Sequence, residues 1–123
     1  MSQLIPHLLL RTDTGASHVA TLLRTAGYMV SKINDDATVE RISGAPHVDG
    51  VVVDLPALAA IALVRRMKAL HQRDVVLVVI SAAPASVRRA LPSVRVIRPE
   101  EVGDDLVSAV DLALVAHPIR RTG

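Results

Sequence analysis

The sequence predicts an α/β fold in which a doubly wound, parallel five-stranded sheet carries helices on both faces. Apolar segments of strand length alternate along the chain with segments of helical periodicity. Two strand-like segments, residues 50–54 and 74–81, are apolar without alternation, which is typical of parallel strands buried on both faces. With 123 residues, 50 % of them apolar, the chain is long enough for one domain with a substantial core.

The N-terminal half of the chain contains three of the expected strands. Residues 7–10 (HLLL) form a short apolar strand closed by a loop signal, RTDTG. Residues 17–27 place apolar side chains on one helical face, and residues 28–33 are expected to form an edge strand. Residues 35–43 predict a short helix with an aspartate as N-cap, before the valine-rich strand that ends on Asp54.

The C-terminal half continues the alternation. Residues 57–72 predict a broadly apolar helix with a basic outer stripe. After the second buried strand come a short helix over 84–91, a strand over 94–97 and a last helix over 104–117. Residues 118–123 are expected to form a flexible tail, and no linker divides the chain.

Composition excludes several classes of function. The chain has no cysteine, which excludes thiol chemistry, and a single tyrosine is its only aromatic residue, which disfavours base stacking. It has no apolar run long enough for a membrane span. Its sequence shows no nucleophile–base pair, phosphate-binding glycine loop or zinc signature. We therefore expect a cytoplasmic protein that is not an enzyme, needs no cofactor, and binds neither membranes nor nucleic acid directly.

The expected strands end on polar or charged residues. Ligands of a doubly wound sheet bind in the crevice beyond the carboxyl ends of its strands. The residues that the sequence places there are Arg11, Thr12 and Asp13 after the first strand, Asp54 after the third, Ser81 after the fourth and Arg98 after the fifth. This edge of the sheet is the candidate site.

Four short motifs around these residues resemble the receiver domain of two-component response regulators (the CheY-like superfamily). The segment AGYMV stands 27 residues before Asp54, and Asp49 precedes that residue by five. The motifs ISA at 80–82 and RP at 98–99 are similar to the family's Ser/Thr-Ala and Lys-Pro. The resemblance covers about residues 7–116 and implies a flavodoxin-like sheet of order 2-1-3-4-5, here with a shortened fourth helix.

The resemblance also implies roles for the candidate site. In that family the aspartate of the third strand accepts a phosphoryl group from a histidine kinase, and an acidic pair after the first strand holds Mg²⁺. Asp54 matches the phosphoacceptor position, and Ser81 and Arg98 match the switch positions. A working phosphoacceptor would need Mg²⁺ held by Asp13 and Asp54.

The departures from the family pattern favour a degenerate, or pseudo-, receiver. The expected acidic pair is replaced by Arg11 and Thr12, or by Leu10 and Arg11 if no residue is deleted, and Arg95 replaces the readout aromatic of the fifth strand. We expect Arg11 or Arg98 to form a static ion pair with Asp54 that closes the site, and no metal to bind. Ser81 is expected to satisfy a backbone group.

The resemblance implies an interaction surface on the fourth helix, the fifth strand and the last helix. The expected partner is another signalling protein or domain, or a second copy of the chain. The residues on this surface are Arg88, Arg89, Arg95, Asp104, Asp105 and Asp111. A third alternative is a STAS-like anti-anti-sigma regulator, whose fold opens with strands before its first helix; the order of elements separates it from a receiver.

Overall fold

The computed structural model describes residues 5–13, 18–70 and 75–116. Its single sheet is parallel throughout and has the strand order β2-β1-β3-β4-β5, so the predicted order 2-1-3-4-5 is confirmed. The strands are β1 (His7–Thr12), β2 (Met29–Ile33), β3 (Gly50–Asp54), β4 (Val76–Ile80) and β5 (Arg95–Ile97). The predicted edge strand is therefore β2, at one end of the sheet.

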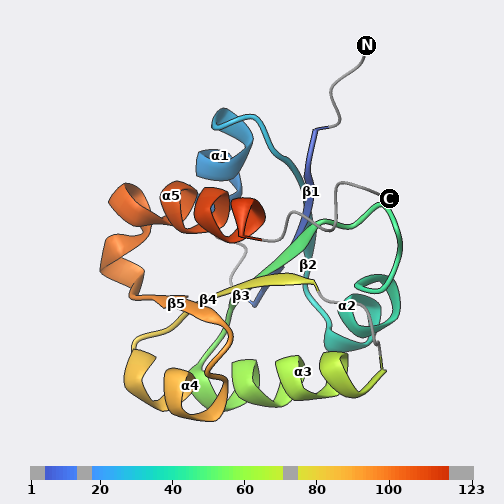
Figure 1. Ribbon diagram of the computed structural model, residues 1–123, viewed down its shortest axis with the longest axis vertical. Helices are drawn as coiled ribbons and strands as arrows, with labels where there is room; N and C mark the ends of the chain where they lie inside the picture. The colour runs from blue at the N-terminus through green and yellow to red at the C-terminus, as the bar shows by residue number, and fades with distance from the viewer. Residues whose placement is uncertain (1–4, 14–17, 71–74, 117–123) are drawn as a thin grey trace.

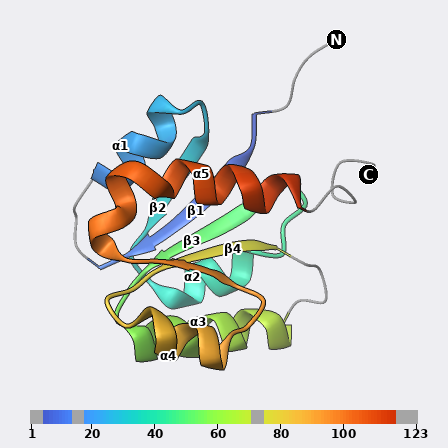
Figure 2. The same ribbon diagram turned by 60° about the vertical axis from the view of Figure 1, so that its left-hand side comes forward.

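Helices cover both faces of the sheet. The helices are α1 (His18–Thr25), α2 (Asp36–Ile42), α3 (Ala57–Leu70), α4 (Pro84–Ala90) and α5 (Val102–Val115), with a 3-10 turn η1 (Pro99–Glu101) before the last. α1 and α5 lie on one face, and α2, α3 and α4 lie on the other (Figures 1 and 2). α4 has only seven residues, as expected for a shortened fourth helix.

The core consists of two aliphatic layers, one on each face of the sheet. Leu9, Val51 and Val53 pack with α2, α3 and α4, whereas Leu10 and Val52 pack with α1 and α5. Successive side chains of a strand point to opposite faces, so β1 and β3 contribute to both layers. Each fully buried Val or Leu contributes about 1.5–3 kcal/mol through the hydrophobic effect.

An arginine from the preceding helix lies over each edge strand. The Arg24 guanidinium donates to the carbonyl of Val30 in β2 at 2.9 Å. The Arg88 guanidinium donates to the carbonyl of Val96 in β5 at 3.2 Å. Each of these contacts satisfies one backbone carbonyl of an edge strand.

Most predicted boundaries shift by one or two residues, and two of these differences have a clear structural reason. β1 continues through Arg11 and Thr12, because it pairs with β3 as far as Thr12, and this pairing overrides the loop signal. α5 begins at Val102, two residues early, since η1 leads directly into it. The expected tail at 118–123 lies outside the described residues. No helix in the described part of the chain is long and apolar enough to cross a membrane.

Candidate functional site

The register of the sheet places Arg11 and Asp54 on opposite faces. Thr12 is paired with Asp54, and Arg11 is paired with Val53. Residues paired in register across parallel strands point to the same side, and successive residues of one strand alternate. Asp54 therefore faces α1 and α5, and Arg11 faces α2 and α3.

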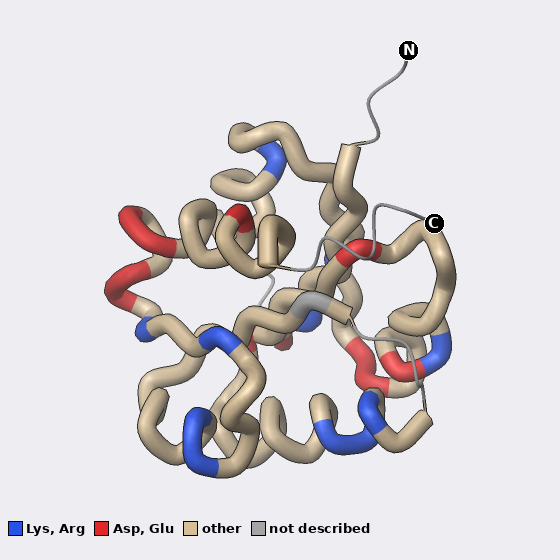
Figure 3. The backbone as a smooth tube through the Cα atoms, in the orientation of Figure 1, with Lys and Arg blue, Asp and Glu red and all other residues tan. Residues whose placement is uncertain are grey.

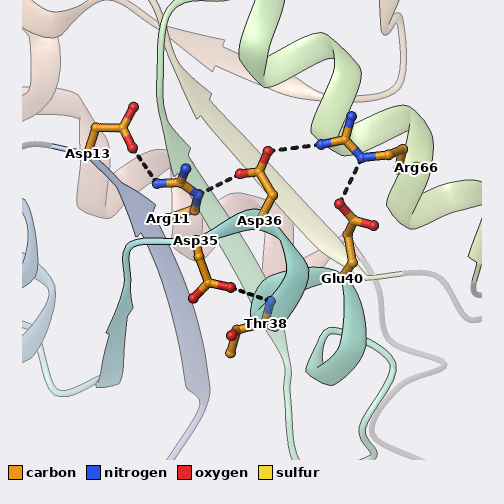
Figure 4. Close-up of polar contacts among 7 residues, drawn as sticks. All are labelled: Arg11, Asp13, Asp35, Asp36, Thr38, Glu40 and Arg66. Carbon is orange, nitrogen blue, oxygen red and sulfur yellow. Dashed lines mark hydrogen bonds and ion pairs between the residues drawn. The ribbon is translucent and has the colours of Figure 1, made fainter.

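Arg11 is a buried cation with two carboxylate partners. Its side chain is 9 % exposed, its Nη1 donates to Asp13 Oδ1 at 2.8 Å, and its Nε donates to Asp36 Oδ1 at 2.7 Å (Figure 4). Burial by itself lowers the pKa of Arg11, but the hydrogen bonds with the two carboxylates raise it above its ordinary value. The guanidinium is thus held charged and oriented from two sides.

The contacts of Arg11 continue into α2 and α3. The Nη2 of Arg66 donates to Asp36 Oδ2 at 2.9 Å, and its Nε donates to Glu40 Oε2 at 2.7 Å. Asp13, Arg11, Asp36, Arg66 and Glu40 therefore form an ion-pair ladder that joins β1, α2 and α3 (Figure 4). The ladder links the carboxyl end of β1 to the two helices that cover it.

Asp54 is half-buried and, among the described residues, forms no ion pair. Burial raises the pKa of Asp54, and His18, at the start of α1, opposes the shift. The predicted ion pair with Arg11 or Arg98 is therefore wrong for the part of the chain that the structure describes. Arg11 points to the other face, and Arg98 is exposed, with its backbone N–H donating to Glu101 Oε1 at 2.8 Å.

Ser81 lies directly after β4, and its side chain is buried. Its Oγ accepts a hydrogen bond from the backbone N–H of Ala83 at 3.0 Å. Its own N–H donates to the carbonyl of Ile97 in β5 at 2.9 Å. The expectation that Ser81 satisfies a backbone group is confirmed, and the contact fixes the start of the β4–α4 loop.

At the end of β1, the described residues differ from those of a receiver-type magnesium site. Mg²⁺ requires near-octahedral oxygen ligands, usually with one or two carboxylates. Asp13 already accepts from the Arg11 guanidinium, and the residue level with Asp54 on β1 is Thr12 rather than an acid. A divalent ion bound by Asp13 would therefore compete with a cation that the fold itself supplies.

Sequence reasoning missed the role of Asp36. Asp35 caps α2 by accepting from the N–H of Thr38 at 2.8 Å, whereas Asp36 bridges the two arginines of the ladder. One signal was available, because Asp36 and Glu40 are four residues apart and share a face of α2. Their partners come from β1 and α3, so only the packing of these elements identifies them.

No protein-family model and no curated protein sequence matches the chain. Several solved structures share its fold. A response regulator receiver protein from Sinorhizobium medicae WSM419 superposes with a TM-score of 0.73 at 24 % identity, over 91 % of this chain and 96 % of that one. The signal receiver domain of an HD domain-containing protein from Pseudomonas fluorescens Pf-5 gives 0.75 at 16 % identity, over 97 % and 99 %.

A third similar structure is a de novo designed Rossmann 2x3 protein, with a TM-score of 0.69 at 16 % identity, over 87 % of this chain and 90 % of that one. The chain therefore shares its flavodoxin-like fold with these receiver domains and with the designed protein, and at these identities the likeness is one of fold. The order strand–helix–strand at its start differs from that expected of a STAS-like regulator.

Proposed function

We propose that this protein is a signal-transduction module with a degenerate receiver domain, which acts by protein–protein interaction without being phosphorylated. The observation that carries the proposal is the position of Arg11. At the end of β1, where receiver domains carry an acidic pair, a buried guanidinium is bonded to Asp13 and Asp36.

The chemistry of phosphoryl transfer explains why this substitution matters. A phosphoryl group carries negative charge, and its transfer to a carboxylate requires a cation beside the acceptor. Arg11 donates a hydrogen bond to Asp13 and points away from Asp54, so Arg11 does not supply that cation itself. The acceptor position is retained while the electrostatic support of the reaction is absent from β1.

The interaction surface that we propose lies on α4, β5 and α5. Its charged residues are all exposed: Arg88, Arg89, Arg95, Asp104, Asp105 and Asp111. The partner would be another signalling protein or domain, or a second copy that uses the same surface. We place the protein in the cytoplasm, as a regulator without catalytic activity, cofactor, or direct contact with membranes or nucleic acid.

One observation favours a second candidate function, that of a working phosphoacceptor. No arginine in the described part of the chain forms an ion pair with Asp54. The ion pair that was expected to close the site therefore gives no support to the hypothesis of a degenerate receiver. An acceptor carboxylate must be free to react, and Asp54 has no ion pair with any residue in the described ranges 5–13, 18–70 and 75–116.

Amide NMR spectra decide between the two. The protein would be titrated with Mg²⁺ and then with beryllofluoride, a mimic of the phosphoryl group, with Asp54→Asn as the matched control. We expect the two proteins to respond alike, with no shifts clustered at Asp13, Asp54 and Ser81. Shifts that cluster there and vanish in Asp54→Asn would reject the proposal and establish the phosphoacceptor.

A further inference from the structure

Charge is segregated along the chain beyond the third strand. Residues 55–98 contain eight arginines and lysines but a single acid, Asp74, whereas residues 99–116 contain five acids and no base. Among the described residues, the basic ones lie on α3, on α4 and on or directly after β5, and the acids gather on η1 and α5 (Figure 3). The small formal net charge of +2 hides this separation.

The basic face is formed by Arg65 and Lys68 of α3 with Arg88 and Arg89 of α4. All four side chains are exposed, and none of the described carboxylates forms an ion pair with them. Lys68 Nζ donates to the Ser93 hydroxyl at 2.8 Å, which places it toward the α4–β5 loop. Arg65 is one helical turn from Lys68 on the same side of α3, and α4, which carries the other two cations, packs against α3.

Arg66 has the carboxylate partners that the basic face lacks among the described residues. It is the next residue of α3, but it turns toward α2, where Asp36 and Glu40 neutralise it. Like charges without counter-ions repel one another and weaken the compact state. Two large apolar side chains of α3, Leu58 and Leu70, are also 85 % and 60 % exposed. The outer surface of α3 and α4 thus combines uncompensated cations with exposed apolar area.

The acidic face has the complementary composition. Glu100, Asp104 and Asp105 are exposed around the start of α5, and none of them is ion-paired among the described residues. Further along the helix, Leu112 and Val115 are 57 % and 66 % exposed. The helix dipole accounts for acids in the first turn of α5, but it does not account for the basic face.

We propose that the basic face binds the acidic face of a second copy of this chain. The two faces lie on opposite sides of the sheet, with α3 and α4 on one side and α5 on the other (Figures 1 and 3). In the contact that we propose, α3 and α4 of one copy meet the start of α5 of the next, which is a head-to-tail arrangement that leaves one basic and one acidic face free for further copies. The inference rests on the proposed function, in which the domain acts by association. It divides the proposed α4–β5–α5 surface into a basic part, extended onto α3, and an acidic part, and it replaces self-contact of one surface by contact between the two parts.

Sedimentation velocity of the full chain tests the proposal. Samples from about 10 µM to about 1 mM, the range of weak association, would be compared at low and high NaCl in the presence of EDTA. We expect the average mass to rise above 13.1 kDa with concentration at low salt, to continue beyond the dimer, and to return to the monomer at high salt.

Charge-reversal variants identify the surfaces. Arg65→Glu and Asp105→Lys should each weaken the association by about tenfold, because an attractive pair becomes a repulsive one. An equimolar mixture of the two should associate again, since each retains one native face. Arg41→Glu is the matched control: it makes the same charge change at an exposed arginine on α2, and it should leave the association unchanged.

Four outcomes would overturn the head-to-tail contact. In the first, the protein stays monomeric under all conditions. In the second, the mass stops at the dimer and is the same in Arg65→Glu, and in the third, Arg65→Glu and Arg41→Glu weaken the association equally. In the fourth, the protein is a monomer whose basic face binds a DNA duplex instead. Since EDTA excludes Mg²⁺, this result is independent of the beryllofluoride experiment. Either proposal can therefore fail without the other.

Discussion

Arg11 and Asp54 lie on neighbouring strands at the same edge of the sheet, yet the fold treats their charges in opposite ways. Arg11 is buried and bonded to two carboxylates. Asp54 is half-buried beside Thr12, and burial raises its pKa without an ion pair from the described residues. The fold therefore compensates the charge of Arg11, whereas burial disfavours the charged form of Asp54.

The largest expected effect is that of Arg11→Ala. The variant loses both ion pairs of a cation whose side chain is 9 % exposed, and it leaves Asp36 with only Arg66. We expect a loss of about 2–4 kcal/mol in the free energy of unfolding, measured by urea denaturation with an unchanged m-value. Arg41→Ala, at an exposed arginine on α2, serves as the control and should change it by less than about 0.5 kcal/mol. Equal losses in the two variants would mean that the ladder contributes nothing.

Asp54→Asn should change stability in the opposite direction. A carboxyl whose pKa is raised by folding stabilises the protein below its unfolded pKa of 3.8, and this contribution is lost as the pH rises through the raised value. At neutral pH the variant should therefore be the more stable protein, by about 0.5 kcal/mol after allowance for solvent screening of a half-exposed group.

Urea midpoints of Asp54→Asn and the wild type, measured from pH 3.5 to about 7, check the sign of this effect. The advantage of the variant should grow with pH over that range. Asp13→Asn is the matched control and should destabilise the protein, because Asp13 accepts from Arg11. If Asp54→Asn proved less stable at neutral pH, Asp54 would have to be a stabilising group, and the contrast with Arg11 would disappear.

The sequence was sufficient to predict the sheet, its order and the location of the candidate site. Two apolar runs without alternation identified β3 and β4, and Asp54 followed from the end of the first of them. The direction of the Arg11 side chain was not predicted. The first strand was expected to end at residue 10, so the alternation of side chains along the strand was not extended to Arg11. With two more residues in β1, alternation alone places Arg11 with Leu9, away from Asp54.

The ladder was beyond the reach of sequence patterns for a different reason. Its five members come from β1, the residue that follows β1, α2 and α3, and the contact between Arg66 and Asp36 spans 30 residues. From spacing along the sequence, only one part of the ladder could be inferred, which is that Asp36 and Glu40 share a face of α2. Which arginine meets these carboxylates depends on how α3 packs beside α2, and that is a property of the folded chain.

The smallest expected effect is that of Arg66→Ala, and it divides the ladder into an inner and an outer half. Arg66 is 46 % exposed, whereas Arg11 is 9 % exposed, so water and salt screen the outer pairs more strongly. We expect Arg66→Ala to cost less stability than Arg11→Ala, and this cost to vanish in about 1 M NaCl, where the Debye length is about 3 Å. The loss in Arg11→Ala should persist there, because a buried pair is screened less. Urea denaturation of both variants at low and high salt provides the comparison. Equal salt sensitivity would show that burial does not protect the Arg11 contacts, and that the ladder is a surface network throughout.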